Sequence, residues 1–244
     1  MSQSTFVFKE IDAEGLATLN AIEEAKTFNH WMYETILPHC SGKVLEIGSG
    51  IGNISECFIA DGYDITLSDV RDNYCDILRQ KFGSSVKSVE KLDLVDSNFE
   101  QEYTHLLQQF DTVFALNVVE HIENDTLAIS NACRLLRPNG KLIILVPAYQ
   151  WLYNRFDEEL EHYRRYTQSS LNQLFYNNEI RIVHQQYFNA MAIIGWFVSG
   201  KLQHNRTIPA AQMHLYDLLV PIFKWVDRLV FRKIGLSVIA VGKN

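Results

Sequence analysis

Strands that alternate with helices constrain the fold of this chain more than any other feature. Short segments rich in β-branched and aliphatic residues predict strands at 43–47, 64–68, 86–92, 112–116, 141–146, 180–186 and 237–241. Segments typical of helices separate them, at residues 53–61, 73–82, 125–136 and 168–177. This alternation predicts βαβ units, and therefore a mostly parallel sheet with helices on both faces. The nearly continuous apolar run at 142–146 fits a strand buried on both sides.

Composition excludes several classes of protein. The 244 residues include 22 Lys and Arg against 29 Asp and Glu, a net charge of −7, whereas a general nucleic-acid binder needs a basic surface. No C-x-x-C pair occurs among the four cysteines, so we expect free thiols in a reducing compartment and no zinc site: Cys40, Cys57, Cys75 and Cys133. Because no signal-peptide pattern and no long apolar run occurs, we expect a cytoplasmic protein.

A glycine turn follows the first predicted strand, in the sequence VLEIGSGIGN at residues 44–53. Glycines let the backbone adopt positive φ and approach a ligand closely. A dinucleotide fingerprint needs its third glycine at position 53, where this chain has Asn53. Glu46 precedes the turn, and its carboxylate suits a ligand whose near end is positively charged rather than a pyrophosphate. A plain strand–helix turn, and a buried carboxylate that caps the helix, remain the alternatives.

The pattern E-x-G-x-G-x-G after the first strand resembles motif I of the class I S-adenosylmethionine (SAM) dependent methyltransferases. Further landmarks match the family in residues 40–150 and in the last strand: Asp69 ends ITLSD, Asp93 and Leu94 end the third strand, and Asn117 lies in FALNVVEHI. The resemblance implies that Asp69 holds the ribose hydroxyls, Asp93 and Leu94 lie beside the adenine, and Asn117 lines the methionine moiety. Structural or surface acids remain the alternative for Asp69 and Asp93. The predicted cofactor site comprises Glu46, Gly48, Ser49, Gly50, Gly52, Asn53, Asp69, Val70, Asp93, Leu94, Asn117 and Val118.

The same resemblance implies an α/β, Rossmann-like class I methyltransferase fold. We expect a seven-stranded sheet in the order 3-2-1-4-5-7-6, its seventh strand antiparallel, with helices on both faces and a helical lid. The expected organisation is a single methyltransferase domain, with a helical cap at 1–40, a SAM-binding core at 41–186 and 235–244, and an apolar lid insertion at 187–234.

Methyl transfer from a sulfonium is an in-line displacement, so alignment of the two reactants is the protein's main task. A base is needed only when the acceptor must lose a proton, as a hydroxyl must. We expect methylation, most often on oxygen, of a small acceptor that is anionic or linked to a saccharide or lipid, with S-adenosyl-L-homocysteine as the product. An NAD(P)-dependent oxidoreductase and a non-catalytic SAM-binding protein are the rival functions.

Two histidines are candidates for the base, because the ordinary pKa of an imidazole, about 6.5, suits proton removal near neutral pH. His162 lies in the loop after the fifth strand, and His121 follows Asn117 in the sequence NVVEH. A structural role is the alternative for His121. In some relatives E-x-x-E-H with a later histidine binds a divalent metal, but Asn117 replaces the first glutamate here, so no metal is predicted.

The loop after the fifth strand is aromatic and charged, and its pattern D-x4-HYRRYT resembles a bacterial branch of the family often found beside or fused to glycosyltransferases. Arginine side chains offer planar forks for an anion. The predicted acceptor-binding residues are Trp31, Tyr149, Tyr163, Arg164 and Arg165. Core packing is the alternative for Trp31, and salt bridges to residues 157–161 are the alternative for the arginines. Thr167 is the expected N-cap of the following helix.

Residues 213–231 form an apolar segment with one narrow polar stripe, made of His214, Asp217, Lys224 and Arg228 at helical spacing. Such a helix is buried against the protein body or against another apolar surface. Pro221 starts or kinks this helix. The segment therefore covers the active site, or it serves a lipid-tailed acceptor or peripheral membrane contact. We expect a small-molecule acceptor, no nucleic acid, and a monomer or homodimer.

Overall fold

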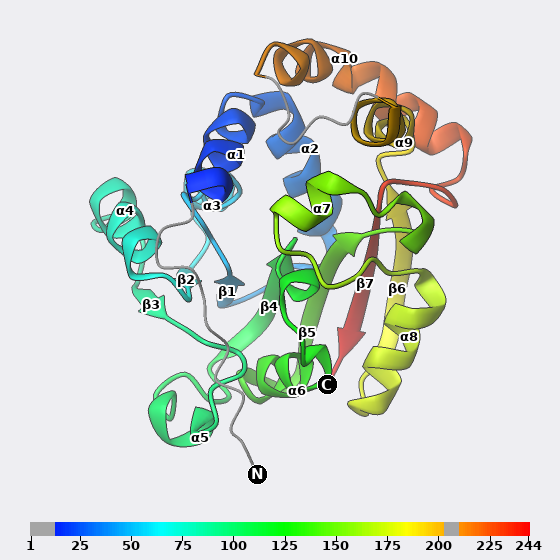
Figure 1. Ribbon diagram of the computed structural model, residues 1–244. Coiled ribbons are helices and arrows are strands. Elements are labelled where there is room, and N and C mark those ends of the chain that lie inside the picture. The colour runs from blue at the N-terminus through cyan, green and yellow to red at the C-terminus, as the bar shows by residue number, and fades with distance from the viewer. Residues whose placement is uncertain (1–12, 203–209) are drawn as a thin grey trace.

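A computed structural model describes residues 13–202 and 210–244, with side chains at 15–200 and 213–244. Within these residues, seven strands form one sheet in the order β3-β2-β1-β4-β5-β7-β6 (Figure 1). The strands are β1 (Val44–Ile47), β2 (Ile65–Asp69), β3 (Val89–Lys91), β4 (Phe110–Leu116), β5 (Leu136–Pro147), β6 (Arg181–Phe188) and β7 (Ser237–Lys243). Strand β7 is antiparallel to both β5 and β6. The predicted strand order and the antiparallel seventh strand are confirmed.

Both faces of the sheet are buried, as the apolar strand sequences predict. In β5, Leu142 and Ile144 belong to one core cluster, whereas Ile143 and Leu145 belong to the other. Successive side chains of a strand point to opposite faces, so an unbroken apolar run is the expected sequence for a central strand. The first cluster packs under α5 (Phe99–Glu102), α6 (Asp125–Arg134) and α8 (Gln168–Asn177), and the second under α2 (Lys26–Ile36), α3 (Ser55–Ala60) and α4 (Asp72–Phe82).

Some predicted boundaries are wrong. The strand expected at 86–92 is limited to Val89–Lys91, at the edge of the sheet where pairing is one-sided. The fifth strand begins at Leu136 rather than 141, and it contains Asn139, whose φ of 69° marks an irregularity inside the strand. Pro221 lies inside a long helix, so a helix start at that residue is also wrong. The N-cap at Thr167 is confirmed, because its hydroxyl accepts a hydrogen bond from Ser170 N.

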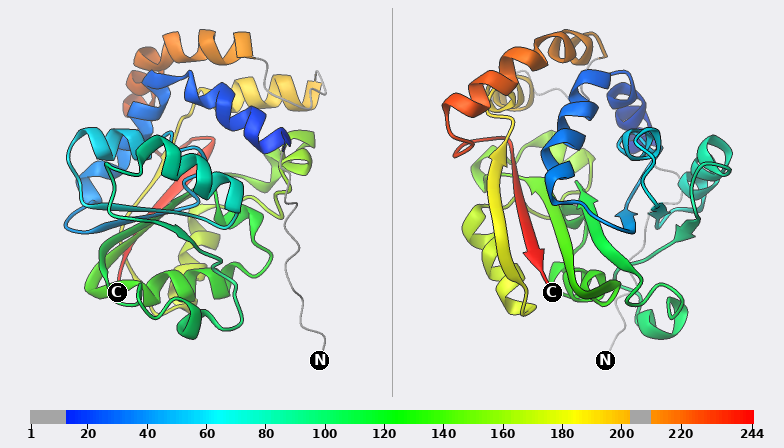
Figure 2. Two further views of the ribbon diagram at one scale, coloured as in Figure 1. Left: turned by 90° about the vertical axis from the view of Figure 1, so that its left-hand side faces the viewer. Right: turned by 180° about the vertical axis from the view of Figure 1, so that it is seen from behind.

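Helices cover the edge of the sheet at which the parallel strands end (Figures 1 and 2). These are α1 (Ala13–Glu23), α9 (Ala192–Trp196), the π-helix η4 (Phe197–Leu202) and α10 (Ala210–Leu229), together called the cap. The loop from β5 to α8 reaches the same edge through the short helices η3 (Gln150–Leu152) and α7 (Arg155–Glu159). Among the described residues, no helix is both long enough and apolar enough to cross a membrane.

Candidate active site

A cavity of about 1220 Å³ lies between the carboxyl ends of the strands and the cap. Ligands of open parallel sheets bind at this edge, where the strand order reverses. Most of the predicted cofactor residues line the cavity: Glu46, Gly48, Ser49, Gly50, Asn53, Asp69, Val70, Asp93, Leu94, Asn117 and Val118. His121, His162, Tyr163 and Arg165 line it as well. Residues as far apart in the sequence as Glu46 and Arg165, 119 positions, therefore line the same cavity.

The glycine turn after β1 needs its glycines for two different reasons. Gly48 has a φ of 68°, and a Cβ at this position would overlap the side chain of Val118 on the cavity wall. Gly52 has a φ of 84°, and a Cβ there would overlap the ring of Phe82. Gly52 does not line the cavity, so it shapes the turn rather than approaching a ligand.

Glu46 is buried in β1 yet faces the cavity, and its carboxylate accepts a hydrogen bond from the Ser55 hydroxyl. Burial raises the pKa of Glu46 to about 8, although the Ser55 hydrogen bond acts in the opposite direction. No cation is paired with this carboxylate among the described residues. Glu46 therefore contacts Ser55 at the start of α3, as the capping alternative expects, and it also faces the cavity, where its contact with a ligand stays a prediction.

Asp69 ends β2 and lies on the cavity wall. One carboxylate oxygen accepts a hydrogen bond from Gly50 N at 3.0 Å, and the other accepts one from Arg71 N at 3.0 Å. Burial raises its pKa, against the effect of these backbone donors. Since Asp69 is only 5% exposed, the alternative of an ordinary surface acid is wrong.

The next two strand ends complete the cofactor side of the cavity. Asp93 is half-buried and accepts a hydrogen bond from Val95 N at 2.9 Å, and burial raises its pKa. Asn117 has a φ of 55°, a left-handed conformation that asparagine tolerates better than most residues. The backbone N–H of Asn117 donates to Leu145 O at 2.8 Å, which fixes the turn after β4 against β5.

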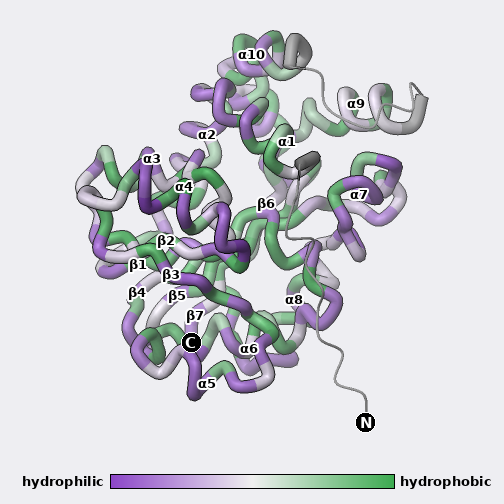
Figure 3. The backbone as a smooth tube through the Cα atoms, turned by 60° about the vertical axis from the view of Figure 1, so that its left-hand side comes forward, coloured by the Kyte–Doolittle hydropathy of each residue, from purple (hydrophilic) through white to green (hydrophobic). Residues whose placement is uncertain are grey.

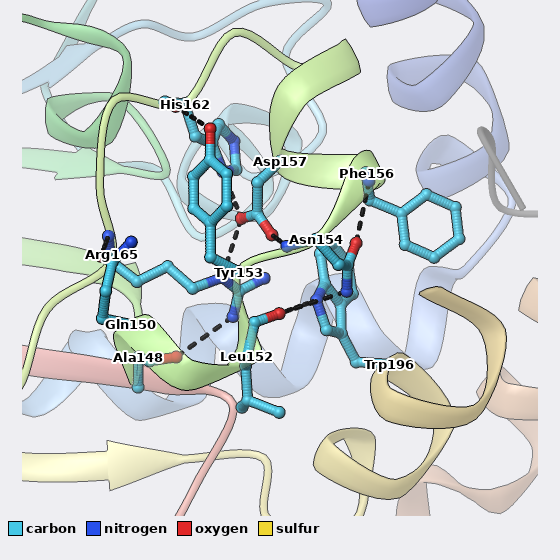
Figure 4. Close-up of polar contacts among 10 residues, drawn as sticks. All are labelled: Ala148, Gln150, Leu152, Tyr153, Asn154, Phe156, Asp157, His162, Arg165 and Trp196. Carbon is cyan, nitrogen blue, oxygen red and sulfur yellow. Dashed lines mark hydrogen bonds and ion pairs between the residues drawn. The ribbon is translucent and has the colours of Figure 1, made fainter. Parts of the chain in front are cut away.

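His162 is held by a buried carboxylate. Its Nδ1 lies 2.9 Å from Asp157 Oδ1, and Arg165 Nε donates to that same oxygen at 2.8 Å (Figure 4). Asn154 N donates to the other oxygen at 2.9 Å. Burial alone would raise the pKa of Asp157, but the hydrogen bond from His162 and the charge of Arg165 outweigh it and hold the pKa below its usual range. A carboxylate acceptor at Nδ1 favours the ring tautomer with its lone pair on Nε2.

Arg165 joins this loop to the cap. Its Nη1 donates to Ala148 O at 3.1 Å, and its guanidinium lies 4.7 Å from the ring centre of Trp196 in α9 (Figure 4). Trp196 in turn donates through Nε1 to Leu152 O at 3.3 Å. The residues that hold His162 are therefore connected to both β5 and the cap.

His121 and Glu120 lie against His162. The two imidazole rings meet edge to face at 4.5 Å between centres, and burial, followed by the neighbouring His162, lowers the pKa of His121 to about 3. Such a ring is a weak base. Glu120 is fully buried, neither of its oxygens has a hydrogen-bond partner among the described residues, and burial raises its pKa to about 7.

These three residues also have the chemistry of a metal site. Each offers one ligand atom, and the three atoms lie within 4.8 Å of one another. An imidazole pair with a carboxylate suits a divalent transition metal, and the unpartnered oxygens of Glu120 fit such a ligand role. Asn117, which argued against a metal in the sequence, lines the same cavity.

The remaining predicted residues lie elsewhere. Trp31 is buried in the core and packs on Phe188, with ring centres 4.4 Å apart. Tyr149 stacks on Tyr187 at 5.1 Å. Arg164 Nη1 forms an ion pair with Asp125 at 2.8 Å. None of the three predicted residues lines the cavity, so their predicted contacts with an acceptor gain no support from the geometry.

Sequence reasoning missed two residues of this site. The sequence indicates Asp157 only as a salt-bridge partner for the arginines, although it stands five residues before His162 in the D-x4-HYRRYT pattern. Nothing in the sequence distinguishes the full burial of Glu120 from the exposure usual for a glutamate.

Comparisons with known proteins agree with this geometry. The model of a family described as "Methyltransferase domain" matches residues 10–185, well over half of the chain. The chain belongs to this family. A methyltransferase with the class I fold takes its methyl group from SAM, so the predicted enzyme class and the predicted cofactor are confirmed.

Two curated relatives illustrate how far the sequence similarity reaches. A ubiquinone biosynthesis O-methyltransferase of Actinobacillus pleuropneumoniae is 29% identical over 102 residues, which cover 41% of this chain and 43% of the relative. The highly reducing polyketide synthase 40 of Fusarium mangiferae is 30% identical over 104 residues, 42% of this chain and 4% of that protein. The matched segments thus span less than half of each relative.

Solved structures show the same fold at low identity. A methyltransferase of Haloferax volcanii, in complex with the Trm112 methyltransferase activator, has a TM-score of 0.62 at 13% identity, covering 97% of this chain and 98% of that one. A SAM-dependent methyltransferase from Archaeoglobus fulgidus has a TM-score of 0.58 at 15% identity, covering 88% and 94%.

Proposed function

We propose that this methyltransferase transfers the methyl group of SAM to a hydroxyl oxygen of a small acceptor, with His162 as the general base. The observation that carries the proposal is the contact of 2.9 Å between His162 and the buried Asp157, on the wall of the SAM cavity. A hydroxyl must lose its proton during methylation, and a neutral imidazole oriented by a carboxylate is suited to accept it.

The acceptor oxygen attacks the methyl carbon in line with the C–S bond and gives its proton to His162 Nε2. The C–S electron pair returns to sulfur, so the sulfonium becomes the neutral thioether of S-adenosyl-L-homocysteine. Asp157 stabilises the imidazolium that forms, and Arg165 holds Asp157. His121 is disfavoured as the base because its lowered pKa makes it a weak proton acceptor.

The cavity wall supports an acceptor that combines polar and apolar parts. On the cap side the lining is apolar, with Met213, Leu219 and Phe223 from α10. On the side of the loop it contains Tyr163 and Arg165. We therefore propose an acceptor that is anionic or saccharide-containing and carries an apolar portion, such as a lipid-linked saccharide. The HYRRYT resemblance, with its association with glycosyltransferases, favours the same class.

The test is His162→Gln in an assay of tritiated methyl transfer from SAM to a metabolite extract. We expect kcat to fall about 10²- to 10⁴-fold, while SAM affinity measured by calorimetry stays unchanged. His105→Gln, an exposed histidine on another part of the molecule, is the matched control. Wild-type kcat in His162→Gln would contradict the proposal.

A second candidate mechanism rests on the convergence of Glu120, His121 and His162. A divalent cation held by these residues would polarise the acceptor oxygen and lower the pKa of its hydroxyl. Titration of Mg²⁺, Mn²⁺ and Zn²⁺ by calorimetry distinguishes the two. Heat that Glu120→Gln abolishes, together with loss of turnover in EDTA, would favour the cation over His162 as a free base.

A further inference from the structure

One face of α10 is exposed although it is apolar. Its side chains recur every three or four residues along the helix, and each is 54–64% exposed: Leu215, Leu218, Ile222, Trp225 and Leu229. This spacing places all five on one stripe of the helix. We call it the outer stripe. In the figures α10 lies at the outer edge of the molecule, and no other element of the described residues covers its far side (Figures 1 and 3).

The opposite face of α10 is firmly held, so the outer stripe does not result from loose packing. Val220 and Phe223 are buried in the core. Asp217 accepts hydrogen bonds from the backbone amides of Thr27 and Phe28, at 3.3 and 2.7 Å, at the start of α2. Asp217 is thus one fixed point of the helix. A second carboxylate nearer the C-terminal end of α10 also anchors it, and the two together set the rotation of the helix about its axis.

That second anchor is Asp227, which is 5% exposed. It accepts hydrogen bonds at 2.7 Å from the amides of both Asn189 and Ala190, between β6 and α9. Both carboxylates of this segment are therefore turned inward. Rotating the outer stripe into the protein would expose two apolar core residues and break these four hydrogen bonds.

The exposed charged side chains of residues 213–234 are all positive, and the exposed carboxylate of Glu34 on the neighbouring α2 is paired with Lys224. Arg228, Arg232 and Lys233 are exposed within or just after the last turn of α10. In residues 213–234, the described segment, no carboxylate points to solvent, because Asp217 and Asp227 point inward. The whole chain carries a net charge of −7, so this face is locally opposite in sign to the rest.

We infer that the outer stripe binds the surface of an anionic lipid bilayer, with α10 lying along the interface. Apolar side chains with a Trp, bordered by arginine and lysine, are the composition of a helix that enters the boundary between headgroups and acyl chains. Basic residues beside it gain attraction from anionic lipids. This inference goes beyond the proposed reaction and does not depend on which acceptor is methylated.

Because the outer stripe and part of the cavity wall belong to the same helix, lipid binding would bring the cavity close to the membrane. Met213, Tyr216, Leu219 and Phe223, on the inward side of the same helix, line the cavity, and Leu215, at the edge of the outer stripe, lines it as well. A helix lying on a bilayer would therefore form the wall between the membrane and the SAM site. An acceptor with an apolar tail would reach the cavity without its tail crossing water.

A second copy of the chain is the competing occupant, since stripes with this spacing also pair helices. A two-fold interface brings the same patch of both subunits together. Arg228, Arg232 and Lys233 would then meet the same cations of the other copy, with no outward carboxylate of residues 213–234 to pair with them. Charge complementarity therefore favours an anionic lipid surface over self-association.

The experiment is flotation of the full chain with vesicles of phosphatidylcholine alone and of phosphatidylcholine mixed with phosphatidylglycerol. We expect binding only, or much more strongly, to the anionic vesicles, with binding weakened by salt. Trp225→Gln should lower partitioning about tenfold or more, because a large exposed apolar contact is lost. Arg228→Gln should lower it about fivefold, which corresponds to about 1 kcal/mol.

Tyr176→Gln is the matched control, because Tyr176 is an aromatic side chain 77% exposed on α8, away from the cap. We expect it to float like the wild type. Calorimetry with SAM shows whether each variant is folded, and it also separates this inference from the proposed function. Absence of wild-type protein from the anionic vesicles would overturn the inference. So would a dimer in sedimentation velocity that Trp225→Gln dissociates.

Discussion

The replacement Glu46→Gln should make the ligand-free protein more stable and at the same time weaken SAM binding. Burial raises the pKa of Glu46 from its ordinary value of 4.5 to about 8. In the unfolded chain the carboxyl group ionises freely above its ordinary pKa, whereas in the folded protein it must stay protonated or bear a buried charge. The free energy of unfolding of the wild type therefore falls as the pH rises between these two values, whereas that of the Glu46→Gln variant does not fall for this reason.

The magnitude follows from linkage. The full difference of about 3.5 between the two pKa values corresponds to about 5 kcal/mol at 1.36 kcal/mol per pKa unit. At pH 7 the loss of stability has accumulated only over the interval from the ordinary pKa of 4.5 up to pH 7, which corresponds to about 3 kcal/mol. For a chain of this length that free energy raises Tm by about 6–12 °C. The difference should vanish below about pH 4.5, grow with pH, and level off above about pH 8.

SAM should reverse the advantage of the variant. Its amino-acid end carries an ammonium group, and the ionised carboxylate of Glu46 can pair with it, whereas the glutamine amide cannot. Losing a hydrogen bond between charged groups costs about 1.5–3 kcal/mol, a decrease in affinity of about ten- to a hundredfold. Binding to the wild type should also release a proton at neutral pH, which calorimetry in buffers of different ionisation enthalpy measures.

The assay is thermal unfolding of both proteins over a pH series, with and without SAM. Glu90→Gln, a strand glutamate outside the cavity, is the matched control and should bind SAM as tightly as the wild type. A Tm difference between Glu46→Gln and wild type that is the same at every pH would refute the reasoning. A variant that binds SAM as tightly as the wild type would refute the proposed contact with the ligand.

Three further substitutions test the site. Asp69→Ala should raise the Kd for SAM about ten- to a hundredfold through loss of two charge-assisted hydrogen bonds to the ribose, and a calorimetric Kd within about threefold of wild type would remove Asp69 from that role. Asp157→Asn should lower kcat by about 10²-fold or more, with SAM affinity unchanged, because His162 loses its orienting carboxylate; an unchanged kcat would contradict this. Gly48→Ala should destabilise the protein by about 1–2 kcal/mol in urea unfolding, since its φ of 68° disfavours a side chain, and pairing it with Val118→Ala should recover only the part due to overlap.

The fold was predictable because its signals are local and repeated. The apolar run in β5 indicates burial on both faces of the sheet, and the glycine turn after β1 indicates positive φ at Gly48 and Gly52. Each requires only a few neighbouring residues to be interpreted. The cofactor side of the cavity shares this property, since its residues lie in or shortly after the carboxyl ends of four strands, and topology alone brings these ends together.

The acceptor side was less predictable because it depends on contacts between segments far apart in the chain. Trp31 packs on Phe188, a partner 157 positions away, and no pattern around Trp31 separates this packing from contact with an acceptor. Arg164 and Arg165 are neighbours in the sequence, yet one pairs with Asp125 near the surface and the other is buried on Asp157. The backbone direction of one loop decides between them, and the sequence does not encode that direction locally.

The buried carboxyl groups in and around the cavity differ in the direction in which their surroundings shift the pKa. Burial raises the pKa values of Glu46 and Glu120, whereas the hydrogen bond from His162 and the charge of Arg165 lower the pKa of Asp157 despite its burial. A fixed negative charge therefore lies behind His162, where it would stabilise the cation that the proposed proton transfer forms. Glu46, at the other end of the cavity, would ionise when a cationic ligand binds. The proposed division of the site, with cofactor binding at Glu46 and proton transfer at His162, follows from these different surroundings of the two carboxyl groups.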